Sequence, residues 1–150
     1  MNMDTYLKIA EMLAEESKAT KLKVGCVVVR DGNFLSFSYN GTPPGTDNTC
    51  EDEHNKTYPE VIHAESMAIT KAAKSGVAID KATMCITHAP CIDCAKLIYQ
   101  AGIQQVWFRH PYKSTDGVDF LLNQGIDVRY LPSWNKGASS ALKDTSWITK

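Results

Sequence analysis

The feature that most restricts the fold of this chain is the alternation of helical and strand-like patterns in its second half. Stretches with helical apolar spacing alternate there with short runs rich in β-branched and aromatic residues. We expect helices at 63–75, 91–102 and 117–125, and strands at 82–87, 105–109 and 126–131. Strands that alternate with helices run parallel, because parallel neighbours need a crossover connection. The pattern therefore predicts an α/β fold.

The first half adds a helix and a hairpin. Residues 3–18 have helical apolar spacing, and the runs 24–29 and 34–39 flank Asp31-Gly32, a dipeptide typical of tight hairpins. The predicted order is α-β-β-α-β-α-β-α-β. It indicates a three-layer α/β/α sandwich around a five-stranded mixed sheet whose last three strands are parallel.

Loops and a tail complete the organisation. Residues 40–48 are dense in Asn, Gly and Pro, and the polar stretch 46–60 continues them. Long loops in a compact domain are usually functional or mobile. We expect one domain over 1–131, followed by a loosely attached polar tail at 132–150.

Composition excludes several classes of protein. The 150 residues include 16 basic and 17 acidic side chains, a net charge of −1, which gives no electrostatic footprint for nucleic acid or a membrane surface. No apolar run reaches the roughly 20 residues of a membrane span, and the N-terminus lacks a signal-peptide pattern. We expect a cytoplasmic protein, in which five irregularly spaced cysteines do not form a disulfide framework.

Two short motifs carry candidate chemistry. His63-Ala64-Glu65 and the pair Cys91/Cys94, preceded by a proline, each open a predicted helix. His-x-Glu alone is a weak signal, and Cys-x-x-Cys alone fits a redox pair, a zinc half-site or coincidence. The proline stands before the cysteine pair, whereas thioredoxin-type redox pairs usually have it inside.

Together the motifs predict a catalytic zinc site. Cys91 and Cys94 are three residues apart and share one side of a helix start, where the thiolate form is favoured. With His63 they make three ligands and leave the fourth position open to water, as in catalytic zinc sites. Glu65 is then the expected proton shuttle. The combination matches the signature of zinc nucleobase deaminases.

Four longer segments resemble the deoxycytidylate (dCMP) deaminases, including those of bacteriophages. They are KVGCVVVRDGNFLSFSYNGTPPG (23–45), YPEVIHAESMAI (58–69), APCIDCAKLIYQAGIQQVWF (89–108) and YKSTDGVDFLLNQGIDVRYL (112–131). The resemblance covers residues 3 to about 131 and implies a cytidine deaminase-like fold. YNGTPPG is characteristic of the dCMP branch, whose last strands are parallel, whereas free-cytidine deaminases join them antiparallel.

The resemblance implies roles for further residues. Asn40 matches a contact to the deoxyribose, and the Ala64 backbone matches the group that reads the pyrimidine edge. Tyr112 and Lys113 match the pair near the substrate phosphate, and Lys21 is a further candidate phosphate contact. The implied reaction is hydrolysis of dCMP to dUMP, which supplies thymidylate synthesis, in the host cytoplasm if the chain is phage-encoded.

The resemblance also implies regulation. The family is typically a homohexamer activated by dCTP and inhibited by dTTP, with Mg²⁺ accompanying the effector. Gly41, Thr42 and Gly45 belong to the implied effector loop. Two departures from the family pattern are Ser38, where a glycine is common, and His88, where relatives often have an apolar residue.

Three alternatives remain open at this point. The same chemistry could act on free cytidine, deoxycytidine or a tRNA base, although near-neutral charge argues against RNA. The chain could also be a non-catalytic zinc scaffold, although such a site has no use for Glu65. Finally, Cys26, Cys50 and His54 could suggest a second, structural zinc, but they form no tight motif.

Overall fold

The computed structural model describes residues 1–132 and has the predicted order of elements. The helices are α1 (Met3–Ala14), α2 (Ala64–Lys74), α3 (Ile92–Gln100) and α4 (Asp116–Asn123), and the strands are β1 (Gly25–Arg30), β2 (Asn33–Tyr39), β3 (Thr83–His88), β4 (Gln105–His110) and β5 (Asp127–Tyr130). The predicted tail lies outside the described residues, apart from its first position.

The strands form one mixed sheet in the order β2-β1-β3-β4-β5. β1 is antiparallel to both β2 and β3, whereas β3, β4 and β5 run parallel. The predicted five-stranded sheet with parallel last strands is therefore confirmed.

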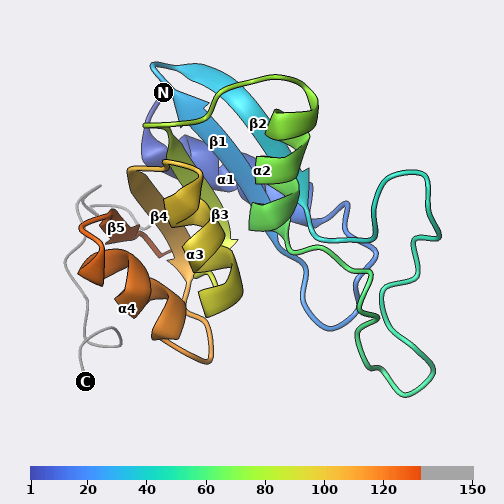
Figure 1. The fold of residues 1–150 in the computed structure, drawn as a ribbon. Helices are drawn as coiled ribbons and strands as arrows, with labels where there is room; N and C mark the ends of the chain where they lie inside the picture. The colour runs from blue at the N-terminus through green and yellow to red at the C-terminus, as the bar shows by residue number, and fades with distance from the viewer. Residues whose placement is uncertain (133–150) are drawn as a thin grey trace.

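The two faces of the sheet bury separate apolar cores. Val27, Cys85 and Trp107 pack on one face, together with side chains of α1. Val28 and Met84 lie on the opposite face, in the larger core beneath α2, α3 and α4. This alternation is the period of two expected of a sheet buried on both faces. Figure 1 shows the resulting three layers, with α1 on one side and the other helices on the other.

Helix α1 lies directly on β1. A Cβ atom built on Gly25 would stand 1.8 Å from the carbonyl oxygen of Ala10, so only glycine permits this approach. The helix ends at Ala14, four residues earlier than predicted. Just beyond it, the Ser17 hydroxyl donates to the Asn40 carbonyl (2.8 Å) and accepts from the Ala19 N–H (3.2 Å), which takes the chain off the helical path. The other bounds differ from the prediction by at most two residues.

The long loop between β2 and α2 folds back on itself at the edge of the sheet. Gly41 and Ile62 exchange backbone hydrogen bonds of 3.1 and 2.7 Å, so the loop leaves and returns at one place. Within it, the Tyr58 N–H donates to the Cys50 carbonyl at 2.8 Å and closes a smaller hairpin. His63, the residue just before α2, therefore lies near the point where β2 ends. None of the helices within residues 1–132 is long and apolar enough to cross a membrane.

Candidate metal centre and adjoining pocket

The three predicted zinc ligands meet at the starts of two neighbouring helices. His63 is the N-cap residue of α2, Cys91 is the N-cap residue of α3, and Cys94 lies in the first turn of α3. Both N-cap residues have extended backbone conformations, with ψ of 152° and 169°. The helix starts thus bring together residues 28 and 31 positions apart.

The spacing of the ligand atoms fits one tetrahedral ion. His63 Nδ1 lies 3.5 Å from Cys91 Sγ and 3.4 Å from Cys94 Sγ. With ordinary Zn–N and Zn–S bonds, a tetrahedral site separates nitrogen from sulfur by about 3.6 Å. The three ligand atoms lie within 4.8 Å of one another, and residues 1–132 contain no other such group of three. The residues considered for a second zinc do not gather: Cys26 is buried in β1, and His54 is exposed.

The two thiols share their protons unequally. Hydrogen bonds from Cys94 and then His63 lower the pKa of Cys91 to about 4, against the opposing effect of burial. The pKa of Cys94 is raised, first because it donates to Cys91 and then because it is buried. A cation that bound both sulfurs would displace the remaining thiol proton, since metals take cysteine as thiolate.

Glu65 is a buried carboxyl beside this centre. It is 4% exposed, and burial is the main cause that raises its pKa to about 7. It does not belong to the cluster of ligand atoms, but it lines the same pocket as His63 and Cys91. A carboxyl with such a pKa exchanges protons readily near neutral pH.

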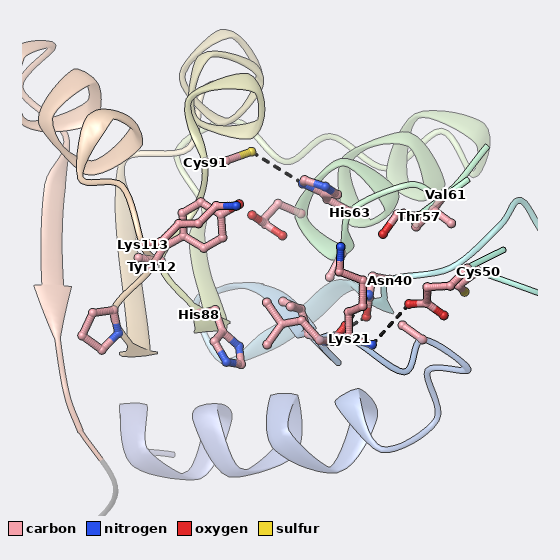
Figure 2. Close-up of a pocket in the computed structure, with 18 residues that line it drawn as sticks. Lys21, Asn40, Cys50, Thr57, Val61, His63, His88, Cys91, Tyr112 and Lys113 are labelled. Atoms are coloured by element: carbon pink, nitrogen blue, oxygen red, sulfur yellow. Dashed lines mark hydrogen bonds between the residues drawn. The ribbon is translucent and has the colours of Figure 1, made fainter. Parts of the chain in front are cut away.

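One pocket of about 450 Å³ adjoins the centre, within the size range of small-molecule sites. Every residue predicted to contact substrate lines it: Lys21, Asn40, Ala64, Tyr112 and Lys113. Figure 2 shows Tyr112 and Lys113 on one side of the pocket and Asn40 and Lys21 on the other, with His63 and Cys91 toward the top of the view. The two lysines therefore approach the pocket from different walls.

Asn40 is fixed by the segment that precedes β1. Its Nδ2 donates to the Leu22 carbonyl and its Oδ1 accepts from the Val24 N–H, both at 2.8 Å. Each end of the amide keeps one further hydrogen-bonding position, because an Asn side chain has two donors and an acceptor with two lone pairs. The side chain is thus held in place while still able to bind a ligand.

Ala64 lines the pocket at the start of α2, where backbone N–H groups lack helical partners. As the first residue of α2, its N–H has no intrahelical acceptor. Its carbonyl accepts a hydrogen bond from Ser38, and the carbonyl of Ala68 accepts one from Ser36. Ser38, which departs from the family glycine, therefore fastens the start of α2 to β2.

The predicted effector loop lies on a second, smaller pocket of about 160 Å³. Gly41 and Thr42 line it together with Lys18 and Lys71, whereas Gly45 does not. Asn40 and Cys50 line both pockets, so the two cavities share a wall.

Glu51 is a pocket residue that sequence reasoning missed. Its carboxylate accepts the backbone N–H groups of Thr20 (3.0 and 3.1 Å) and Lys21 (3.3 Å). It thereby ties the small hairpin of the β2–α2 loop to the segment that carries Lys21. No sequence motif predicts this contact, because Thr20 and Lys21 lie 31 and 30 residues away from Glu51 in the sequence.

His88 also lines the pocket, although it was noted only as a departure from the family pattern. Its Nδ1 lies 2.9 Å from the Thr87 hydroxyl, and its ring lies 4.9 Å from that of His110. Burial, with a smaller contribution from His110, lowers the pKa of His88 to about 4, so this ring is neutral at pH 7.

Gly117 is a second position that only the structure reveals. A Cβ atom there would stand 2.2 Å from the Pro90 carbonyl oxygen and 2.7 Å from the Cys91 carbonyl carbon. The first turn of α4 thus packs directly on the peptide groups on either side of Cys91 and helps to fix the position of this residue.

The chain resembles known proteins over most of its length. The family model for the cytidine and deoxycytidylate deaminase zinc-binding region matches residues 1–110. The deoxycytidylate deaminase of Enterobacteria phage T4 is 33% identical over 178 aligned positions, which cover 90% of this chain and 92% of the phage protein. ComE operon protein 2 of Bacillus subtilis is 37% identical over 130 positions, covering 82% of this chain and 67% of that protein.

A solved structure gives a similar result. The crystal structure of dCMP deaminase from the cyanophage S-TIM5, in complex with dCMP and dUMP, superposes with a TM-score of 0.83 and 43% identity. The match covers 85% of this chain and 95% of that one.

Proposed function

This chain belongs to the cytidine and deoxycytidylate deaminase family, and on that premise we propose that it hydrolyses dCMP to dUMP and ammonia with one zinc ion. The observation that carries the proposal is the cluster of His63, Cys91 and Cys94 beside a buried carboxyl in a nucleotide-sized pocket. A purely structural zinc site would need a fourth protein ligand, and it would have no use for Glu65.

Zinc held by these ligands would supply a water molecule whose pKa is lowered toward about 7. Glu65 takes a proton from the attacking water and delivers it to the ring nitrogen next to the amine-bearing carbon. The same carboxyl would then take the remaining proton from the hydroxyl group added to that carbon and give it to the amine, which leaves as ammonia while the C=O of dUMP forms. Burial of Glu65 suits this role, because it brings the carboxyl's pKa near the operating pH.

The pocket would orient the base and sugar through groups that are already fixed. The Ala64 N–H would donate to the pyrimidine carbonyl, and the Asn40 amide would bond the deoxyribose. Hydrogen bonds from neighbouring segments already hold both groups in place, so little conformational entropy is lost when the substrate binds. Tyr112 and Lys113 would bind the phosphate from one wall, and Lys21 would contribute from the other.

The most direct test is an assay of the zinc-loaded protein on a panel of substrates. We expect loss of cytosine absorbance with dCMP, slower loss with deoxycytidine and cytidine, and no deamination of a tRNA stem-loop. Elemental analysis should find one zinc per chain. Preferred turnover of the tRNA would support the alternative substrate class, and zinc without turnover of any substrate would support a scaffold.

The phosphate assignment predicts a selective effect of Lys113→Ala. Loss of a charge-assisted hydrogen bond costs about 1.5–3 kcal/mol, so kcat/KM for dCMP should fall by about 10–100-fold. Deoxycytidine has no phosphate, so its kcat/KM should change by less than about 2-fold. Steady-state kinetics on both substrates measure this difference.

Lys74→Ala is the matched control, because Lys74 is an exposed lysine at the end of α2 that does not line the pocket. Equal losses with dCMP and deoxycytidine in the Lys113 variant would contradict the assignment to phosphate.

Regulation by dCTP and dTTP, with Mg²⁺ accompanying the triphosphate and a homohexamer as the assembly, is part of the proposal. Its support is the wall shared by the two pockets. Asn40 would touch substrate on one side, while Gly41 and Thr42 touch an effector on the other. Lys18 and Lys71 give the smaller pocket the positive charge that a triphosphate needs. Gly45 would act through the shape of the loop, since it does not line that pocket.

This proposal predicts sigmoidal dependence of the initial rate on dCMP. Coupling between sites is typically about 1–3 kcal/mol, so dCTP should lower the half-saturating dCMP concentration by about 5-fold or more, and dTTP should raise it. Initial rates with and without each triphosphate, on protein of known oligomeric state, measure it. If the oligomeric protein gives hyperbolic rate curves that neither dCTP nor dTTP changes, residues 41–45 do not bind an effector and only connect β2 to the rest of the loop.

A further inference from the structure

The two cysteine sulfurs of the metal centre differ in how their negative charge is stabilised. Cys91 is the N-cap residue of α3, so its sulfur lies at the helix end where the free backbone N–H groups favour a thiolate. Cys94 lies further into that helix and is only 2% exposed, so water cannot solvate its sulfur. A buried thiolate at this position needs a donor from elsewhere in the protein.

Ser66 is placed to be that donor. Its Oγ lies 3.4 Å from Cys94 Sγ, across the contact between α2 and α3. When Cys94 binds a metal its sulfur carries no proton, so the serine hydroxyl must donate and the sulfur must accept. Among the residues that the structure describes, no other hydrogen-bond partner of Ser66 Oγ is found.

A serine near the start of a helix often bonds back to its own helix instead. Thr70 does this one turn later, where its hydroxyl donates to the carbonyls of Ser66 (2.9 Å) and Met67 (3.2 Å). The Ser66 hydroxyl is directed to the neighbouring helix. Its position in sequence, directly after Glu65, places it on the same first turn that carries the catalytic motif.

We propose that Ser66 is a positioning residue that donates a hydrogen bond to the Cys94 thiolate, fixes this ligand and reduces the electron density that it gives to the metal. The inference rests on the proposed zinc site. The α2 start thus supplies a ligand through His63 and supports a second ligand through Ser66. Donors of this kind orient metal ligands and tune the metal's acidity.

The test compares Ser66→Ala with two controls in the full-length protein. Ser66→Thr keeps a hydroxyl at the site, and Thr70→Ala removes a hydroxyl from the same helix that does not reach Cys94. Zinc affinity is measured by competition with a chromophoric chelator. The sulfur-to-metal charge-transfer band is measured on protein substituted with Co²⁺.

Ser66→Ala should weaken zinc binding by about 10–100-fold, as loss of such partners typically does. Its charge-transfer band should move to longer wavelength, because an unbonded thiolate holds its electrons less tightly. Ser66→Thr should stay close to the unaltered protein in both measurements, and so should Thr70→Ala.

An unshifted band and unchanged affinity in Ser66→Ala would overturn the inference. Weaker binding with an unshifted band would overturn it as well, because that result indicates a packing role only. Failure of the unaltered protein to bind zinc would instead contradict the proposed metal site, so the two outcomes are distinguishable.

Discussion

Glu65→Gln is expected to yield a folded protein that binds zinc but turns over dCMP about 10²–10⁴-fold more slowly. Glutamine preserves the size of the side chain and one acceptor oxygen, but it cannot take a proton from water or return one to the ring. Because Glu65 is not one of the three clustered ligand residues, the metal site should survive the change. Turnover per bound zinc is the quantity to measure.

Asp93→Asn is the matched control. Asp93 stands between the two cysteines in sequence, and its side chain is 83% exposed, so the variant removes a carboxylate near the same centre but outside the pocket. We expect its turnover to remain within about 2-fold of the unaltered protein. Near-normal turnover of the Glu65 variant with full zinc content would exclude the proton-shuttle role.

Arg109→Met should lower the free energy of unfolding by about 3–5 kcal/mol, more than any other variant proposed for this protein. Arg109 is 1% exposed in β4, and its guanidinium donates to Asp4 Oδ1 and Glu11 Oε1, both at 2.9 Å. It also donates to the carbonyls of Leu131 (3.5 Å) and Pro132 (3.2 Å). Methionine fills the volume but leaves the buried Asp4 carboxylate without its main partner. Urea unfolding followed by circular dichroism measures the change.

Arg129→Met provides the comparison, since Arg129 pairs with Asp127 at 2.7 Å but is 38% exposed in its side chain. An exposed pair of this kind contributes about 0–1 kcal/mol. Equal losses in the two variants would mean that burial of Arg109 does not determine its contribution.

The Asp4–Arg109 contact also has a defined pH dependence. Burial alone would raise the pKa of Asp4, but the hydrogen bonds and charges of Arg109 and Lys8 outweigh it and lower the pKa below 3.8. A carboxyl with a lowered folded-state pKa contributes stability above its unfolded pKa and loses it as pH falls through the folded value. The difference in unfolding free energy between the unaltered protein and Arg109→Met should therefore shrink below about pH 4. A difference that stays constant from pH 6 to pH 3 would contradict this account.

Much of the fold could be predicted because local patterns and the global topology agree. The hairpin followed from Asp31-Gly32, and the parallel order of β3, β4 and β5 followed from the helices between them. The main error was the end of α1. The prediction extended the helix through the polar residues 15–18, but Ser17 bonds to a carbonyl 23 residues away, and such a partner is not visible in a local pattern.

The candidate centre was predictable because the residues that carry its chemistry stand close together in two short sequence motifs. Cys91 and Cys94 are three residues apart at a helix start, and His63 and Glu65 occupy the start of another helix. Ser66, Glu51 and Gly117 were not predicted, because each acts through a partner on a different element. A serine after a glutamate, an acid in a polar loop and a glycine in a helix are individually unremarkable.

The sequence by itself determined the element order, the sheet's mixed topology and the identity of the residues that bear the chemistry, because these depend on short-range periodicity and residue type. Only the tertiary structure decided that the three ligand atoms lie within 4.8 Å of one another and that one pocket holds every predicted substrate residue. Only the structure shows that Arg109 pairs with Asp4, 105 residues away in sequence, and that the Ser66 hydroxyl contacts Cys94, 28 residues away. The physical reason is that hydrogen bonds and burial depend on distance in space, which the folded packing of α1, α2 and α3 on the sheet sets.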